Sequence, residues 1–196
     1  MRVHEVMSSP AVVVAPETSV KHAAAILDER GFTCLPVVDG DGKLVGAVSE
    51  ADLLMNRFPP DARIPVFERP EREVGATISD VMSVDVLTVV PDDEVSVVLA
   101  ALNAAGHRSV PVVDAGAVVG VVTYRDLVHA LARDDTLIAA DVQRRLDLYG
   151  SPARWTVSVQ CGVVSLSDDR RDPLDRGIAL RVAESVLGVT SCRFTE

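Results

Sequence analysis

The 196-residue chain is acidic, with a formal net charge of -10, and it is rich in apolar residues (48%) but poor in aromatic ones (4%). This length predicts one or two domains, and the apolar content is enough for a sizeable core. Residues 136–196 hold eight basic and eight acidic side chains, so the acidic excess lies in residues 1–135. An acidic surface disfavours phosphate contacts, and few aromatic side chains are available to stack on bases. We therefore expect no nucleic-acid partner.

The remaining composition excludes several other classes. The three cysteines, Cys34, Cys161 and Cys192, show no metal-ligand spacing, so we expect small buried thiols in the reducing cytoplasm and no metal. The N-terminus lacks the apolar core of a signal peptide, and no run of 18 apolar residues occurs, so we expect no membrane span and no membrane contact. The four histidines lie apart and no catalytic motif is present, so we expect no enzyme activity.

The chain contains two copies of one unit. "VM" at 6–7 returns at 81–82, and "PVVD" at 36–39 returns at 111–114, both with an offset of 75. After the next turn the offset is 74, since "GAVSEADL" returns as "GVVTYRDL" from residue 120. So many matches in one order indicate a duplication.

Each copy is predicted to fold as β-α-β-β-α, from apolar runs, helical spacing and an Asp-Gly turn signal. The expected elements of the first copy are a strand, a helix, two strands joined by a turn and a last helix, at 11–15, 16–31, 34–39, 44–48 and 49–58. Those of the second copy are at 86–90, 91–106, 109–114, 117–122 and 123–133.

The segment between the copies carries four prolines and many charges over residues 56–78, and no periodic pattern fits it. It is therefore expected to be an extended connection. A third unit follows, with alternating or helically spaced apolar residues that predict the order α-β-β-α-β, at 136–150, 155–160, 163–167, 172–188 and 189–195. The expected domain boundaries are 1–57 and 79–134 for the copies, 58–78 for the connection and 136–196 for the third unit.

A hydroxyl residue and an aspartate three positions later follow the last strand of each copy, as Ser49 with Asp52 and Thr123 with Asp126. This spacing predicts a capping box, which satisfies free N–H groups at a helix start and contributes about 1 kcal/mol. The corner also suits a ligand. A helix N-terminus attracts anions, and a carboxylate accepts paired hydrogen bonds from a ribose diol. The second interpretation adds to the first.

One copy of roughly 50 residues would bury too little apolar surface to be stable alone. We therefore expect the two copies to pair with pseudo-two-fold symmetry, which creates a cleft at their contact. Such a cleft is where a ligand is expected.

The duplicated pattern V-M … P-V-V-D … G-x-x-S/T-x-x-D resembles a tandem pair of CBS domains, a Bateman module, over about residues 1–134. The resemblance implies an α/β (α+β) fold of two paired repeats, here with a small C-terminal domain. It also implies a regulatory module that senses an adenosine nucleotide (AMP, ADP or ATP) or S-adenosylmethionine. Such pairs commonly form a homodimer through their repeats.

The resemblance also implies site residues. The two corner aspartates would bind the ribose hydroxyls, and the two corner hydroxyls would lie on the phosphate or ribose side. Further contacts would come from the residue before the second aspartate, from the strand starts and from the first helix of each copy. The implied ligand-binding set is Asp126, Thr123, Arg125, Arg108, Thr33, Thr18, Asp52 and Ser49, with Asp93 as the counterpart of Thr18.

These positions predict two unequal clefts. The cleft of Asp126 is expected to combine two cations that suit a phosphate with three hydroxyls, from Arg108, Arg125, Thr18, Thr33 and Thr123. The cleft of Asp52 is expected to contain Ser49, Ala51 and Asp93, whose carboxylate would repel a phosphate. We expect Asp126→Ala to lose more nucleotide binding than Asp52→Ala.

The third unit, with its V-x-V-x-x-G-V-V-x-L hairpin, resembles a BON domain over residues 136–196. That family is associated with phospholipid contact and protein interaction, although "SDDRRDP" stands here where BON domains often carry a glycine. We expect Trp155 to fill the core. The sequence supports a regulatory protein that relays ligand occupancy to a partner, and its alternative is a non-catalytic scaffold whose clefts bind nothing.

Overall fold

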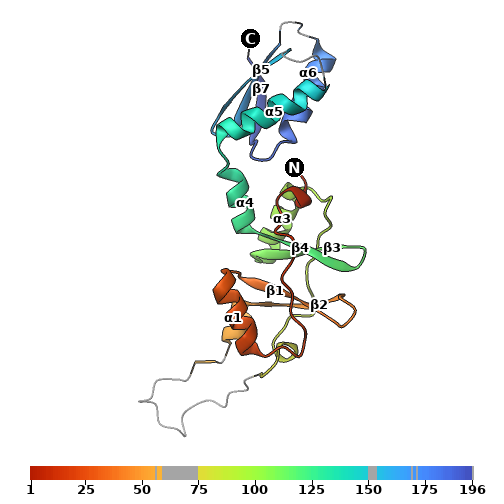
Figure 1. Cartoon of the computed structure of the whole chain (residues 1–196), viewed down its shortest axis with the longest axis vertical. Helices are drawn as coiled ribbons and strands as arrows, with labels where there is room; N and C mark the ends of the chain where they lie inside the picture. The colour runs from red at the N-terminus through yellow and green to blue at the C-terminus, as the bar shows by residue number, and fades with distance from the viewer. Residues whose placement is uncertain (56, 59–74, 150–153, 169, 171, 196) are drawn as a thin grey trace. The chain divides into compact units, whose positions relative to one another are not determined.

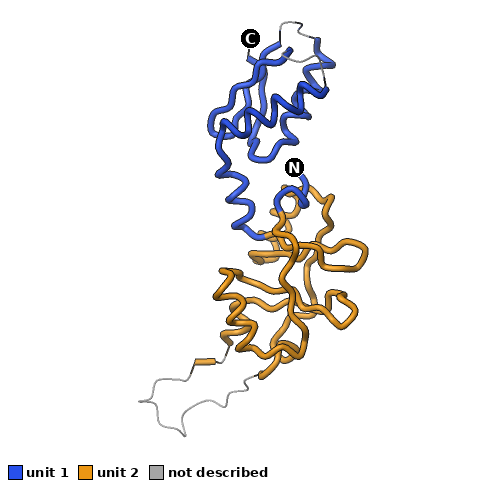
Figure 2. Tube along the Cα trace, in the orientation of Figure 1, with its two compact units in different colours: residues 1–6, 123–196 blue, residues 7–122 orange. Residues whose placement is uncertain are grey.

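The computed structural model describes residues 1–55, 57–58, 75–149, 154–168, 170 and 172–195 (Figure 1). Most of the expected connection, residues 59–74, lies outside the described residues. The chain divides into two compact units (Figure 2), one of residues 7–122 and one of residues 1–6 with 123–196. The last helix of the second repeat is thereby grouped with the C-terminal residues.

The first repeat follows the predicted order closely. Its elements are α1 (Val20–Arg30), β1 (Cys34–Val38), β2 (Leu44–Ser49) and α2 (Glu50–Leu54). Helix α1 begins after Ser19, whose side chain accepts the His22 N–H, and it ends at Gly31 in the left-handed conformation. Helix α2 is shorter than expected, because Met55 already leaves the helical conformation (ψ 127°).

The second repeat has equivalent elements, preceded by a short 3-10 helix, η3 (Ile78–Asp80), as η1 (Val3–Glu5) precedes the first. They are α3 (Val95–Ala105), β3 (Ser109–Asp114), β4 (Ala117–Thr123) and α4 (Tyr124–Leu131). In each repeat the two strands form one hairpin, β1-β2 or β3-β4. The mixed α/β fold class is confirmed.

The predicted first strand of each repeat, at 11–15 and 86–90, is wrong as a full strand. Each is reduced to one parallel bridge, Val14 to Val37 and Val89 to Val112. The next residue already turns, since the Ala15 N–H donates to the Thr18 hydroxyl and the Val90 N–H donates to Asp93. Backbone donors used in a turn cannot extend a strand ladder.

Within residues 7–122 the two repeats exchange a segment. The chain after "VM" of one repeat pairs with the last strand of the other, as Ser8 with Val121 and Ser83 with Ala47. Each pairing places a backbone of the partner repeat directly over a glycine, Gly46 or Gly120. Lys43 also pairs with its own equivalent, Ala117, so the repeats are related by a pseudo-two-fold axis at this bridge.

A core joins the first repeat to η3. It contains Leu35, Val37, Val48 and Ile78, all fully buried, with Leu27 from α1. Since η3 belongs to the chain of the second repeat, this core is completed by the neighbouring copy. A single repeat would leave part of it exposed, as the composition argument implies.

The C-terminal residues form α5 (Asp135–Tyr149), β5 (Trp155–Gln160), β6 (Val163–Asp168), α6 (Pro173–Glu184) and β7 (Ser191–Phe194). Strand β6 pairs antiparallel with β5 and parallel with β7. Trp155 is buried in a second core, as predicted, together with Leu146 and Leu166. The predicted order α-β-β-α-β is therefore confirmed.

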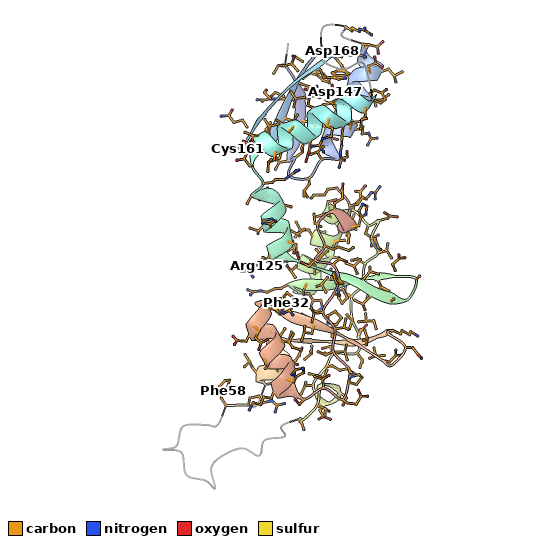
Figure 3. All side chains as sticks on the ribbon, in the orientation of Figure 1. Phe32, Phe58, Arg125, Asp147, Cys161 and Asp168 are labelled. Carbon is orange, nitrogen blue, oxygen red and sulfur yellow. The ribbon has the colours of Figure 1, made fainter. Side chains whose placement is uncertain are left out.

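Two details of this unit differ from expectation or add to it. Cys161 is exposed (Figure 3), so the expectation of a buried thiol is wrong there, because the residue lies in the β5-β6 turn. The buried Asp168 is paired with Arg154 at 3.2 Å, and Arg154 also contacts Asp175 at 2.7 Å. In the described part of the chain, no helix is long and apolar enough to cross a membrane.

Candidate functional site

The corner at the end of the first repeat is a capping box. The Ser49 backbone N–H and hydroxyl both donate to Oδ2 of Asp52, at 2.8 and 2.7 Å. The Asp52 N–H in turn donates to the Ser49 hydroxyl, at 3.4 Å. Both of these hydrogen bonds from Ser49 reach Oδ2 of the Asp52 carboxylate, and among the described residues no hydrogen bond reaches its Oδ1. Oδ1 therefore remains available to a ligand.

The second repeat builds the same corner from its own residues. Thr123 donates its N–H and its hydroxyl to Oδ2 of Asp126, both at 2.7 Å, and the Asp126 N–H donates back at 3.3 Å. The predicted capping role of all four side chains is thereby confirmed. The structure preserves the symmetry that the spacing indicated.

A pocket of about 460 Å³ opens at the Asp52 corner, entirely within residues 7–122. Its volume lies in the range of small-molecule sites. Ala47, Val86, Leu87 and Pro111 supply apolar surface, and Asp52 lies among the polar groups that line it. An apolar wall beside a carboxylate suits a flat base attached to a sugar.

Several polar side chains line the same pocket. The hydroxyls come from Thr33, Ser49, Ser83 and Ser109, and the charged or titratable side chains come from Glu50, Asp52, Asp85, His107 and Arg108. The pocket therefore offers hydroxyl donors, three carboxylates and one guanidinium. A sugar with several hydroxyls would find partners on more than one side.

Strand pairing explains how these residues meet. Cys34 is the register partner of Ser49, and the Glu50 N–H donates to the Thr33 carbonyl at 3.1 Å, so the start of β1 lies beside the corner. The exchanged segment adds Ser83, whose N–H donates to the Ala47 carbonyl at 2.9 Å. Asp85, Val86 and Leu87, further along the same segment, also line the pocket.

Cys34 and Ser109 connect the two repeats at the pocket. They are equivalent positions, and the Ser109 side chain hydrogen-bonds to the Cys34 thiol. Burial raises the pKa of the Cys34 thiol, and the Asp52 charge adds to this rise, while the Ser109 hydrogen bond opposes it. The thiol is therefore a neutral lining group.

The second corner lines a smaller pocket of about 290 Å³ within its own unit. Arg125, Asp126 and His129 line it from α4 (Figure 3 labels Arg125), together with Glu5 and Val6 near the N-terminus and with Ala130 and Leu187. Two basic side chains thus lie near this aspartate. Arg125 has no charged equivalent in the first repeat, where Ala51 stands.

The expected grouping of the site residues needs one correction. The sequence predicts Thr33 and Arg108 in the cleft of Asp126, but in the structure both line the pocket of Asp52. The reason is the contact of Cys34 with Ser109, which brings the preceding residue of each strand to this corner. Ser49 and Ala51 line this pocket as expected.

Thr18 and Asp93 occupy equivalent turns. The hydroxyl of Thr18 accepts the Ala15 N–H, and the carboxylate of Asp93 accepts the Val90 N–H. Asp93 is not among the described residues that line the Asp52 pocket. Both side chains thus have a local structural role at the start of a helix.

Most of the other lining residues were missed from the sequence, among them Glu50, Asp85, Val86 and Leu87. A signal for the last three existed, because they follow the second "VM" motif within five residues. The structure shows that this motif begins the segment which pairs with the last strand of the other repeat. No group of side chains suited to a metal ion occurs among the described residues.

Two repeats that exchange segments around a hydroxyl–carboxylate pocket define a duplicated ligand-binding module. The sequence model of the CBS domain matches residues 3–58 and 78–133, which is more than half of the chain. The chain belongs to the CBS domain family.

Solved structures of CBS domain pairs are similar to this chain over about two thirds of its length. The CBS pair of protein MJ0100, in complex with 5'-methylthioadenosine and S-adenosyl-L-methionine, is 28% identical with a TM-score of 0.54, and the match covers 66% of this chain and 94% of that one. CBSX2 in complex with AMP is 29% identical with a TM-score of 0.54, over 66% of this chain and 94% of that one.

Among curated proteins, the A-adding tRNA nucleotidyltransferase of Aquifex aeolicus is 34% identical over 135 residues. The match covers 68% of this chain but 15% of that enzyme. The similarity therefore lies in a module that the two proteins share.

Proposed function

We propose that this chain is a non-catalytic regulatory module that senses an adenosine-type ligand. The observation that carries the proposal is the pocket at the Asp52 corner, where a capped aspartate lines the same pocket as the apolar side chains of Val86 and Leu87. A carboxylate in this position can accept the ribose diol while these apolar side chains contact the base. The ligands of MJ0100 and CBSX2 all contain adenosine, which supports the same ligand class here.

Each implied site residue has a role in this proposal. Asp52 and Asp126 accept ribose hydroxyls, and Ser49 and Thr123 hold those carboxylates while capping their helices. Arg125 contacts a phosphate at the second corner, and Thr33 and Arg108 contact the ligand at the first. Thr18 shapes the approach to the first helix. AMP, ADP, ATP and S-adenosylmethionine are all candidate ligands.

The module acts through other proteins in this proposal. We infer a cytoplasmic homodimer formed through the CBS repeats, with occupancy relayed to a protein partner on the C-terminal unit. That unit has the element order of a BON domain, which supports a role in protein interaction. A relay requires two conformations that the ligand distinguishes.

The test is calorimetric titration of the full chain with AMP, ATP and S-adenosylmethionine. We expect at least one ligand to bind, and Asp52→Asn together with Asp126→Asn to abolish binding. The Asn side chain keeps an acceptor for the helix cap, so these variants should fold. For AMP and ATP we expect Asp126→Asn to lose more binding than Asp52→Asn, since Arg125 lies at the second corner.

Thermal unfolding provides the control for this test. A ligand that binds only the folded protein must raise the unfolding midpoint, and at a hundredfold excess over Kd the gain is about 2.7 kcal/mol. Binding that persists undiminished in the double variant would contradict the proposed site. A chain that binds no adenosine compound would instead be a scaffold.

A further inference from the structure

The pocket at the Asp52 corner has an unusual balance of charge for a nucleotide site. Glu50, Asp52 and Asp85 contribute three carboxylates to its lining, and Arg108 contributes the one lysine or arginine side chain among the described lining residues. His107 also lines the pocket, and even with its imidazole counted as a cation the three carboxylates outnumber the two basic side chains. The lining therefore has an excess of negative charge.

This balance matters because the sugar fixes where the 5' group lies. In a ribose, C5' carries the 5' substituent and is bonded to C4'. C4' is in turn bonded to C3', which carries one of the two diol hydroxyls. If Asp52 accepts the ribose diol, a 5'-phosphate lies only a few bonds from that diol and therefore close to the same lining. The Debye length at physiological ionic strength is about 8 Å, so salt screens charges that line one pocket only partly.

The surroundings of the pocket do not compensate for this excess. The Cys34 thiol beside Asp52 is held in its neutral form by burial, so it adds no charge. The N-terminus of α2 favours anions, but Glu50 and Asp52 already occupy the first turn of that helix. Glu50, Asp85 and Arg108 are exposed, so the electrostatic interaction of each with a bound phosphate is moderate. The sum of these interactions therefore decides whether the phosphate is repelled.

We propose that the Asp52 pocket selects an adenosine whose 5' substituent carries no negative charge, such as a thioether, and that Glu50 and Asp85 exclude 5'-phosphorylated adenosines. The inference rests on the proposed function and specifies the ligand class of one of its two sites. Glu50 and Asp85 thereby determine specificity, although neither contacts the sugar in the proposed binding mode.

The experiment compares 5'-methylthioadenosine, which is uncharged at the 5' position, with AMP. Both are titrated into the full chain carrying Asp126→Asn, which removes binding at the second corner. At low salt we expect 5'-methylthioadenosine to bind about tenfold or more tightly than AMP, since the excess negative charge of the lining acts on the phosphate. Added salt should strengthen AMP binding and leave 5'-methylthioadenosine binding unchanged.

Variants test the two acidic residues directly. In the same background, Glu50→Gln with Asp85→Asn should narrow the preference to about threefold or less by improving AMP binding. The matched control is Asp28→Asn with Asp41→Asn, which removes two exposed carboxylates of the same unit that do not line the pocket. This control should keep the full preference.

The outcomes separate the inference from the proposed function. AMP binding as tight as that of 5'-methylthioadenosine, or a preference that the control variant abolishes equally, would overturn the inference alone. If neither compound binds to the Asp126→Asn protein, there is no ligand site at Asp52, and the proposed function of this pocket falls with the inference.

Discussion

At the scale of single residues, two glycines explain why the repeat carries its "VM" motif. A Cβ atom added at Gly46 would lie 2.8 Å from Sδ of Met82 and 2.9 Å from the Ser83 carbonyl oxygen. At Gly120 the corresponding distances are 2.8 Å to Sδ of Met7 and 3.0 Å to the Ser8 carbonyl oxygen. The glycine of one repeat thus accommodates the methionine and backbone of the other.

We predict that Gly46→Ala destabilises residues 7–122 by about 1–3 kcal/mol, the usual cost of overpacking. The backbone oxygen of Ser83 cannot move away as the end of a flexible side chain would. It accepts the Ala47 N–H, and the Ser83 N–H donates to the Ala47 carbonyl, so this backbone is held in place. Equilibrium unfolding in urea measures the loss. Because Ser83 lines the pocket, ligand affinity should fall as well.

The matched control for this variant is Gly40→Ala. A Cβ at Gly40 meets no atom within 4 Å, and its φ is not in the left-handed region. Its effect should stay within about 0.5 kcal/mol, as for an ordinary surface change. Equal losses in the two variants would show that the crossing segment does not pack on Gly46.

At the scale of elements, the sequence predicted what local patterns determine. Gly31 and Gly106 end α1 and α3 in the left-handed conformation, and both hairpins lie where the turn signals indicated. The capping boxes were predictable because Ser49 and Asp52 are three residues apart. These features depend on neighbours in sequence.

Other features depend on partners far along the chain, and the sequence did not reveal them. Val14, in the apolar run at 11–15, is buried and pairs with Val37 of β1, but the Thr18 turn limits the pairing of this run to that one bridge. Asp85 reaches the pocket through the Ser83–Ala47 bridge, which joins segments more than thirty residues apart. No periodicity marks such an exchange.

In the C-terminal unit, a single aspartate connects helix α5 to the turn between β5 and β6. Both carboxylate oxygens of Asp135, at the start of α5, accept N–H groups of the β5-β6 turn, Oδ2 from Cys161 at 2.6 Å and Oδ1 from Gly162 at 2.9 Å. Both turn residues have positive φ, 51° and 73°, as a two-residue hairpin requires. The helix thereby fixes the turn.

We predict that Asp135→Ala destabilises the C-terminal unit by about 1–3 kcal/mol, because the N–H of the buried Gly162 loses its acceptor. Asp135→Asn keeps one acceptor oxygen and should lose less. Urea unfolding followed by the fluorescence of Trp155, which lies in this core, reports the change. If Asp135→Asn and Asp135→Ala are equally destabilising, the paired hydrogen bonds are not the source of the effect.

At the scale of the whole molecule, the two compact units have separate cores. Leu35 is fully buried in the core of residues 7–122, and Leu146 is fully buried in the C-terminal core. The described residues that line the Asp52 pocket all belong to the unit of residues 7–122. Stability and ligand binding can therefore be assigned to units one at a time.

We predict two calorimetric unfolding transitions in the full chain. Leu35→Ala should lower the stability of residues 7–122, and Leu146→Ala that of the C-terminal unit, each by about 2–5 kcal/mol, the cost of a cavity after Leu→Ala. An adenosine ligand of the Asp52 pocket, tested in the Asp126→Asn protein, should raise the transition that Leu35→Ala lowers, because a ligand stabilises the unit that binds it. A single transition shifted equally by both leucine variants would show that the units unfold together, and any ligand effect would then belong to the whole chain.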